Sequence, residues 1–272
     1  MATQRIVSQK PMVASQKALI KSPYVYVKFN QAPGATNILD RGTLTPVTKS
    51  YPVNGTLNAV WSSPGFINPN AANSNYVALN DPAYKAHFSM DTLAGVGQLL
   101  LFYEVKSSGF VQVAGPTDQY IFAYGHFSGA NSLQVYLDKG LGNISHRVTD
   151  NASTLYSKSH NILAGAVPIT KVVVLFDFIN QQVLTGINGN AAASSSFTGA
   201  TFGPTNTNRV PTLMSKSDTS PGLYLSHSIF LSEFACFRIT GDISSLFSGL
   251  TTVWDGTEAH GLPWDTLVSM GV

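Results

Sequence analysis

A series of short strand-like runs separated by turn-forming residues is the feature that most limits what this chain can fold into. The runs are rich in β-branched and aromatic residues, whereas the gaps contain Gly, Pro, Asn and Ser, which favour turns. Several short strands with such gaps between them indicate an all-β sandwich or barrel. The expected strands are 24–29, 57–61, 76–79, 86–90, 97–105, 120–127, 133–138, 144–149, 171–177, 182–187, 222–225 and 233–239.

Two of these runs, 133–138 and 143–148, alternate apolar and polar side chains residue by residue. A period of two places one face of a strand on a core and the other face toward solvent. Tyr136 and Arg147 both fall on the polar faces of their runs. The fold class predicted from this pattern is an antiparallel β-sandwich with one polar outer surface.

The remaining segments divide the chain into three expected parts. Residues 1–18 are polar and basic and predict an extended N-terminal arm that docks on a partner, with a disordered terminus as the alternative. Residues 19–250 are expected to form the sandwich, although whether 19–75 join it stays open. Residues 190–222 are expected to be a long surface loop with one short strand near 211–214. A short helix is expected over 242–250 with Asp242 as its cap, followed by a C-terminal tail over 251–272.

Low charge excludes several classes of protein. Only 11% of the 272 residues are charged, against about 25% in an average domain. Charge-rich disorder and long charged coiled coils are therefore excluded, and a net charge of +2 does not indicate specific nucleic-acid binding. The longest aliphatic stretch, 172–176, is far shorter than the roughly 20 residues of a membrane span.

The single cysteine, Cys236, allows no intramolecular disulfide, and the N-terminus lacks the apolar stretch of a secretory signal. We therefore expect synthesis in a reducing host cytoplasm.

The run 171–197 carries a family resemblance. One strand ends in Asp177, a tight turn follows, and a second strand ends in Asn188-Gly189. This arrangement resembles the hairpin of concanavalin A-like jelly rolls, the laminin-G and pentraxin-like group. An unrelated hairpin could also carry Asp before its turn and Asn-Gly after it.

Two further segments extend the resemblance to roughly residues 76–250. Residues 87–104 resemble the early strand pair of the family, and residues 232–240 resemble its late strand, which a short helical turn follows. The resemblance implies a jelly-roll β-sandwich of two antiparallel sheets with one concave face. The family includes lectins, adhesion modules, glycosidases and bacteriophage virion proteins.

Catalytic patterns are missing from the sequence. The three glutamates do not form the closely spaced carboxylate pair of a glycosidase, apart from Glu258 near Asp255 in the expected tail. The sequence contains neither a G-x-S-x-G nor an H-E-x-x-H motif. Cys236 lies in an apolar run and is expected to be a buried small side chain. We predict no catalytic residues, no metal, no cofactor and no enzymatic activity.

The resemblance also raises calcium binding as an alternative, because members of the group often bind calcium through Asp and Asn. No clustered D-x-D pattern supports it here. The oxygen donors that could contribute are Asp177, Asn188, Asp118 and Asp150.

Carbohydrate binding needs exposed aromatic rings beside hydrogen-bonding side chains. Tyr120, Phe122, Tyr124 and His126 are expected on one face of their strand, which would adjoin the polar faces of the next two strands. The alternative is that Tyr120, Phe122 and Tyr124 belong to the core. The predicted carbohydrate-binding residues are Tyr124, His126, Tyr136 and Arg147.

The main functional hypothesis is a non-enzymatic structural or interaction protein of a virus particle, as a capsid decoration or tail surface component of a tailed bacteriophage. Its expected partners are other virion proteins and further copies of itself, and its expected location is the virion. The basic arm would contact them through Arg5, Lys10 and Lys17. The alternatives are a carbohydrate-binding receptor-recognition module of a tail fibre, which would bind a cell-surface glycan, and a glycoside hydrolase.

Overall fold

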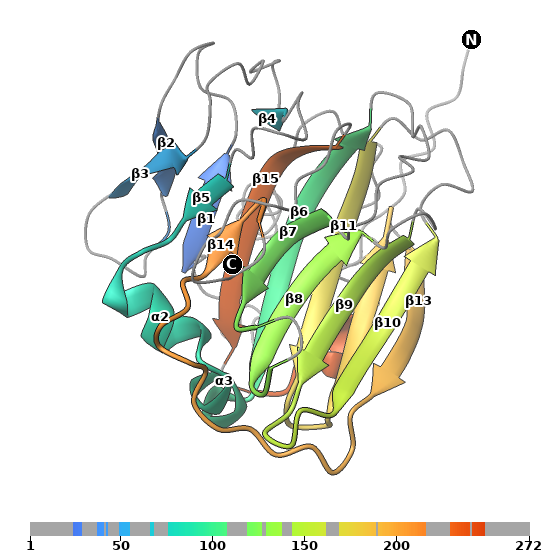
Figure 1. Ribbon diagram of the computed structural model, residues 1–272. Helices are drawn as coiled ribbons and strands as arrows, with labels where there is room; N and C mark the ends of the chain where they lie inside the picture. Colours follow the sequence, from blue (N-terminus) through green and yellow to red (C-terminus); the bar gives the residue numbers. More distant parts are fainter. Residues whose placement is uncertain are drawn as a thin grey trace, which may run out of the picture.

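Two antiparallel sheets packed face to face form the molecule in the computed structural model (Figure 1). The structure describes residues 24–28, 37–40, 42, 49–54, 66–67, 76–107, 119–126, 129–137, 143–161, 169–188, 190–215, 229–239 and 241–247. Their strands are β1 (Val25–Lys28), β2 (Asn37–Asp40), β3 (Lys49–Asn54), β4 (Phe66–Ile67), β5 (Tyr76–Ala78), β6 (Gln98–Ser107), β7 (Gln119–Tyr124), β8 (Ser132–Leu137), β9 (Asn143–Thr149), β10 (Leu155–Asn161), β11 (Ile169–Asp177), β12 (Gln182–Ile187), β13 (Asn190–Ser196), β14 (Thr212–Leu213) and β15 (Ile229–Ile239). Two short helices, α2 (Pro82–Phe88) and α3 (Met90–Val96), and a 3-10 turn, η1 (Ser244–Leu246), complete the described elements.

The strand order defines the two sheets. The first, which we call the β8 sheet, runs β10-β9-β8-β7-β14-β5-β3 and lies in front in Figure 1. The second, the β11 sheet, runs β3-β2-β1-β15-β6-β11-β12-β13, and β3 therefore links the two. The expected antiparallel β-sandwich is confirmed. The described parts of 19–75 join it, since β1 pairs with β15 and β3 pairs with β5.

The strand predicted at 86–90 is wrong, because this segment lies in α2 and the start of α3. The Asp81 side chain accepts a hydrogen bond from the backbone N–H of Ala83, and a proline stands in the first turn, which together favour a helix start. The buried side chains of α2 are Tyr84, His87 and Phe88, a helical spacing that brings them to one face. The likeness of residues 87–104 to a strand pair therefore holds only for their second half, β6.

Five strands were not expected: β2, β3 and β4, which lie within 30–75, and two strands at sheet edges. Residues 190–196, predicted as loop, form β13 beside β12, and residues 155–161 form the edge strand β10 beside β9. Both sit at sheet edges, where pairing of the backbone with one neighbour is sufficient. Small or polar side chains therefore do not prevent strand formation there, and the apolar pattern that reveals a strand is missing.

Of the helix expected over 242–250, the described residues include the 3-10 turn η1. Its N-cap position is Ile243 and not Asp242 as predicted; the Asp242 carboxylate instead accepts a hydrogen bond from the N–H of Ser244, 2.9 Å away. The predicted arm over 1–18, the tail over 251–272, the strands at 57–61 and 222–225, and Asp118 lie outside the described residues.

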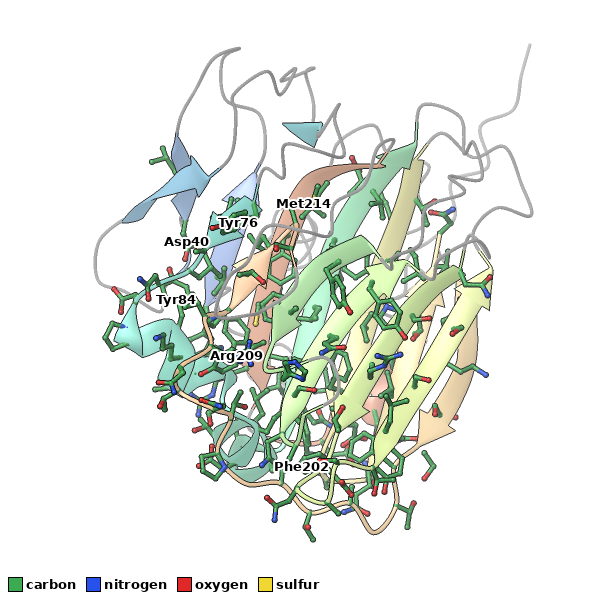
Figure 2. The ribbon with its side chains drawn as sticks, viewed as in Figure 1. Asp40, Tyr76, Tyr84, Phe202, Arg209 and Met214 are labelled. Atoms are coloured by element: carbon green, nitrogen blue, oxygen red, sulfur yellow. The ribbon has the colours of Figure 1, made fainter. Side chains whose placement is uncertain are left out.

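A buried carboxyl group joins α2 to the β11 sheet. Asp40 of β2 is 1% exposed and accepts hydrogen bonds from the backbone N–H groups of Tyr26 and Gly42 and from the Tyr84 hydroxyl (Figure 2). Burial raises the pKa of Asp40, although these hydrogen bonds oppose the shift.

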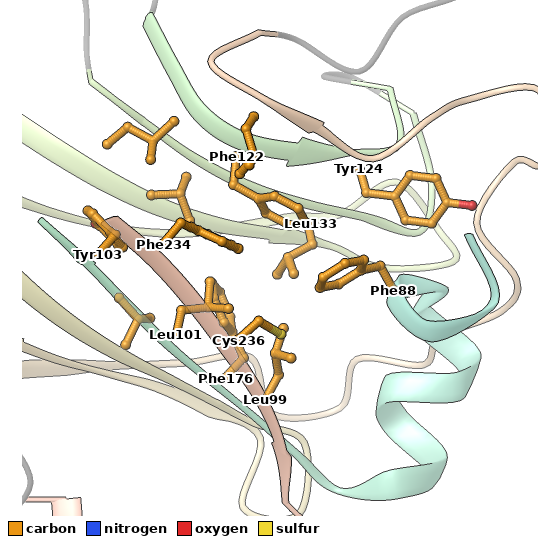
Figure 3. Close-up of a cluster of buried hydrophobic side chains, with 14 of the residues drawn as sticks. Phe88, Leu99, Leu101, Tyr103, Phe122, Tyr124, Leu133, Phe176, Phe234 and Cys236 are labelled. Carbon is orange, nitrogen blue, oxygen red and sulfur yellow. The ribbon is translucent and has the colours of Figure 1, made fainter. Parts of the chain in front are cut away.

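The main core fills the space between the sheets (Figure 3). Phe122 of β7 packs against Phe88 of α2, with ring centroids 4.9 Å apart, and against Phe234 of β15 at 5.4 Å. The outer face of the β11 sheet is also apolar and buried, for example at Leu100 and Phe102 of β6. Burial of both faces explains why β6 reads as a continuous apolar run. Among the described residues, no helix is long and apolar enough to cross a membrane.

Candidate functional site

The outward-pointing side chains of β7–β10, which we call the outer face, form the candidate site. Strand register arranges them in three cross-strand rows, because directly paired residues of adjacent strands point to the same side. The first row is Tyr120, Tyr136, Ser145 and Ser159, the second is Ala123, Gln134, Arg147 and Ser157, and the third is Ser132, Thr149 and Leu155.

A β-bulge decides which aromatic side chains of β7 reach the outer face. The register with β8 shifts between Tyr120 and Phe122, so the extra residue Ile121 reverses the alternation. Tyr120 consequently packs with Ala123 and Tyr136 on the outer face, while Phe122 lies in the main core. The prediction that Tyr120 and Phe122 share one face is therefore wrong.

Tyr136 and Arg147 come together as the sequence pattern predicts. The Arg147 guanidinium lies 4.5 Å from the centre of the Tyr136 ring, and its Nη2 donates a hydrogen bond to the Tyr136 hydroxyl. The Tyr120 ring lies 5.6 Å from the Tyr136 ring. Tyr136 is 2% exposed, and Arg147 is half-buried with its Nε and Nη1 atoms buried, so the pair covers its aromatic rings and leaves only part of the Arg147 side chain exposed.

The other two predicted carbohydrate residues do not join this pair. Tyr124 is 1% exposed and belongs to the core between the sheets, as the stated alternative had it (Figure 3). Burial, with a contribution from the charge of Asp91, raises the pKa of Tyr124 to about 12. His126 follows β7, is half-buried, and its carbonyl accepts a hydrogen bond from the N–H of Gly129.

Three polar side chains of the outer face were missed by sequence reasoning. Ser132, Gln134 and Thr149 are at most 1% exposed. In the part of the chain that the structure describes, the Ser132 and Thr149 hydroxyls and both polar atoms of the Gln134 amide have no hydrogen-bond partner. The alternation of β8 places Gln134 on the polar face, but nothing in the sequence indicates that this polar face is buried.

The charge on the outer face is positive. Arg147 is the charged side chain of the three rows, and among these described residues there is no carboxylate. A glycosidase needs two carboxyl groups flanking its substrate. Hydroxyl, amide and guanidinium groups can instead hold a polar ligand by hydrogen bonds.

A cysteine–histidine contact lies elsewhere, beneath α2. Cys236 Sγ lies 3.9 Å from Nε2 of His87, and His87 stacks on Tyr24 at 4.8 Å. Burial raises the pKa of the Cys236 thiol and, with the nearby Arg238 charge, lowers the pKa of His87 to about 3. Both groups are therefore neutral at pH 7. A nucleophilic cysteine needs a thiolate and access to substrate, and fully buried Cys236 has neither, so its expected structural role is confirmed.

The calcium candidates within the described residues occupy separate turns and already accept hydrogen bonds. Asp177 accepts from the backbone N–H groups of Ile179 and Asn180 and from the side chain of Gln182. Asp150 accepts hydrogen bonds from two backbone N–H groups of its own turn, and the side-chain Oδ1 of Asn188 accepts one from the backbone N–H of Lys171. The described residues contain no group of three or more metal-ligating side chains.

Replacing Asp177 by alanine is expected to lower the free energy of unfolding by about 3 kcal/mol, because a buried carboxylate that organises a turn is removed. Chemical denaturation would measure the loss, with exposed Asp91→Ala as the control that costs less than about 1 kcal/mol. A calcium chelator should leave the unfolding temperature of the wild type unchanged. A chelator-induced drop that Asp177→Ala abolishes would instead make Asp177 a calcium ligand.

Comparison with known proteins yields structural neighbours only. No family profile and no curated protein matches the chain. The botulinum neurotoxin serotype D binding domain superposes with a TM-score of 0.58 at 12% identity, covering 88% of this chain and 53% of that one. The serotype D ligand binding domain in complex with N-acetylneuraminic acid gives 0.60 at 13% identity, covering 88% and 52%. The receptor binding domain of the C/D mosaic serotype gives 0.56 at 12%, covering 87% and 51%. The chain thus shares a fold with domains described as binding domains and spans about half of their length.

Proposed function

We propose that this chain is a non-enzymatic, lectin-like binding module whose outer face recognises a carbohydrate. The observation that carries the proposal is the Arg147–Tyr136 pair, set in a cross-strand surface of hydroxyl and amide groups. Sugars present many hydroxyl groups, and the N–H groups of a guanidinium can donate hydrogen bonds to their oxygens. This proposal takes up the alternative that the sequence left open rather than its main hypothesis.

The approach to the site lies over β10. Leu155, Ser157 and Ser159 of this edge strand are exposed, whereas the outward side chains of β8 are buried. Ser157 is the register partner of Arg147, so a ligand that contacts the guanidinium lies across β9 and β10. Stacking on Tyr136 is blocked by Arg147, and hydrogen bonding therefore supplies the recognition.

The structural neighbours support this proposal through their fold. One of them is a ligand binding domain in complex with N-acetylneuraminic acid. Because the identity is 13% and about half of its length is covered, no binding residue of that domain is transferred to this chain. The proposal of a glycan ligand is therefore based on the residues of the outer face alone.

The test is a glycan array probed with the wild type and with Arg147→Ala. We expect the wild type to bind a subset of glycans and Arg147→Ala to weaken that binding at least about tenfold, since charge-assisted hydrogen bonds are lost. Lys85→Ala is the matched control, because Lys85 is also a half-buried cation with a hydrogen bond, to Thr207 O on another part of the surface. Absence of any glycan binding, or equal binding by Arg147→Ala, would reject the proposal.

Several finer expectations stay predictions. Membership of a virus particle, kinship with concanavalin A-like proteins, self-association and a docking role for Arg5, Lys10 and Lys17 depend on composition and on residues outside the described part of the chain. The copy number of the protein in purified particles would test the first of them.

A further inference from the structure

Four of the buried polar atoms that lack partners in the described residues lie together in one patch of the outer face, while others, such as Nε2 of His160, lie elsewhere. Ser132 and Thr149 are direct register partners, and Gln134 follows two residues after Ser132 on the same side of β8. We call these three residues the Gln134 cluster. Within the described chain, its two hydroxyl oxygens and both amide atoms of Gln134 lack hydrogen-bond partners, although the residues are at most 1% exposed.

Such an arrangement costs stability. Native proteins pair nearly all buried polar groups, because an unpaired amide or hydroxyl gives up its bonds to water without replacement. A patch of adjacent orphaned groups is therefore unusual. Local arrangements that oppose stability are expected chiefly where a site is kept ready for a ligand.

We propose that the Gln134 cluster is a subsite for the acetamido group of an N-acetylated sugar, an inference that rests on the proposed function. The Gln134 amide offers Nε2 as a donor and Oε1 as an acceptor side by side. Another amide presents the complementary acceptor and donor at matching spacing. A carboxylate would leave Oε1 unpaired, and a hydroxyl group carries its donor and acceptor on a single atom.

The neighbours of Gln134 suit the rest of an acetamido group. Ala123, the register partner of Gln134 on β7, is fully buried with the rings of Tyr120 and Tyr136 and provides an apolar contact for the methyl group. On the other side, Gln134 pairs with half-buried Arg147, and Arg147 pairs with exposed Ser157. Along this row of paired residues, the exposed surface nearest to Gln134 is therefore the edge at β10.

The test compares matched sugars by isothermal titration calorimetry: N-acetylglucosamine against glucosamine and glucose, and N-acetylgalactosamine against galactose. We expect the wild type to bind an N-acetylated member at least tenfold more tightly than its counterparts. Gln134→Leu should lose this preference and should melt at the same or a higher temperature than the wild type, because an orphaned amide has been removed. Thr149→Val should likewise keep the melting temperature.

The outcomes separate this inference from the proposed function. Equal binding of the acetylated and non-acetylated sugars by the wild type would overturn the subsite and leave carbohydrate recognition intact. A preference that survives in Gln134→Leu would also overturn it, as would a lowered melting temperature, which would mean that the amide is satisfied within the folded protein. Binding of a peptide amide but of no sugar would overturn both proposals.

Discussion

Lowering the pH from 7 to 5 is expected to reduce the free energy of unfolding by about 4 kcal/mol through two buried histidines, His87 and His146. Both are at most 2% exposed, and burial lowers the pKa of each. In the folded protein they stay neutral at pH 5, whereas in the unfolded chain they take up protons. The loss is a large share of the 5–15 kcal/mol that is typical of a folded protein.

His146 lies between the two sheets. Its Nε2 is 2.7 Å from the Tyr103 hydroxyl and its Nδ1 is 3.2 Å from the Thr185 hydroxyl. The His160 ring faces it at 5.9 Å and has a pKa of about 4, lowered by burial and by the charge of Lys158, so His160 adds to the loss of stability in the same direction. A protonated His146 would therefore lie in a low-dielectric interior beside a second imidazole. None of the groups named here is a carboxylate that could stabilise its positive charge.

The direction of the effect follows from the two pKa values of each histidine. The folded pKa lies below the unfolded value of about 6.5, so the unfolded chain binds more protons between the two values and stability rises with pH in that window. Each fully neutral histidine contributes a slope of about 1.4 kcal/mol per pH unit below pH 6. Asp40 acts oppositely at lower pH, since its raised pKa makes protonation favour the folded state.

Urea denaturation at pH 7, 6 and 5 would measure the effect. His146→Gln, which keeps hydrogen-bonding groups but does not titrate, should reduce the pH slope by about 1.4 kcal/mol per unit. Tyr103→Phe is the control, because it removes the hydrogen bond to His146 while leaving the imidazole, and it should lower stability without changing the slope. A slope that is the same in His146→Gln and the wild type would contradict the prediction.

Truncating Phe122 to alanine is expected to lower the free energy of unfolding by about 4 kcal/mol. The ring is fully buried and joins three elements, because it packs against Phe88 of α2 and Phe234 of β15 from its place on β7 (Figure 3). Close packing on all sides prevents the cavity from collapsing, so the lost contacts are not recovered. The unfolding temperature should fall by roughly 10 °C for a chain of this size.

Phe202→Ala is the matched control, since it removes the same atoms from a half-buried ring at the end of the sandwich. Phe202 packs against Phe178 at 5.2 Å and Phe197 at 5.7 Å. Its truncation should cost about half as much, because solvent fills the space left behind. Scanning calorimetry of both variants would test the difference, and equal losses would mean that Phe122 does not hold the sheets together as described.

The candidate site was only partly predictable from the sequence. Tyr136 and Arg147 were placed correctly, because alternation in β8 and β9 is undisturbed, and Arg147 pairs with Gln134, which lies two residues from Tyr136 on the same face. Tyr124 was misplaced and Tyr120 was grouped with the wrong neighbours, because the bulge at Ile121 leaves no mark in the hydrophobic pattern.

The sequence by itself determined the sandwich, its long central strands and the polar character of one face, since these follow from the period and composition of each strand. Tertiary structure alone decided that α2 replaces a strand, that small-residue segments become the edge strands, and that Gln134 is buried with its amide unpaired. The reason is physical: side-chain periodicity is a property of one segment, whereas register, bulges and burial depend on which strands pair and on what packs over them.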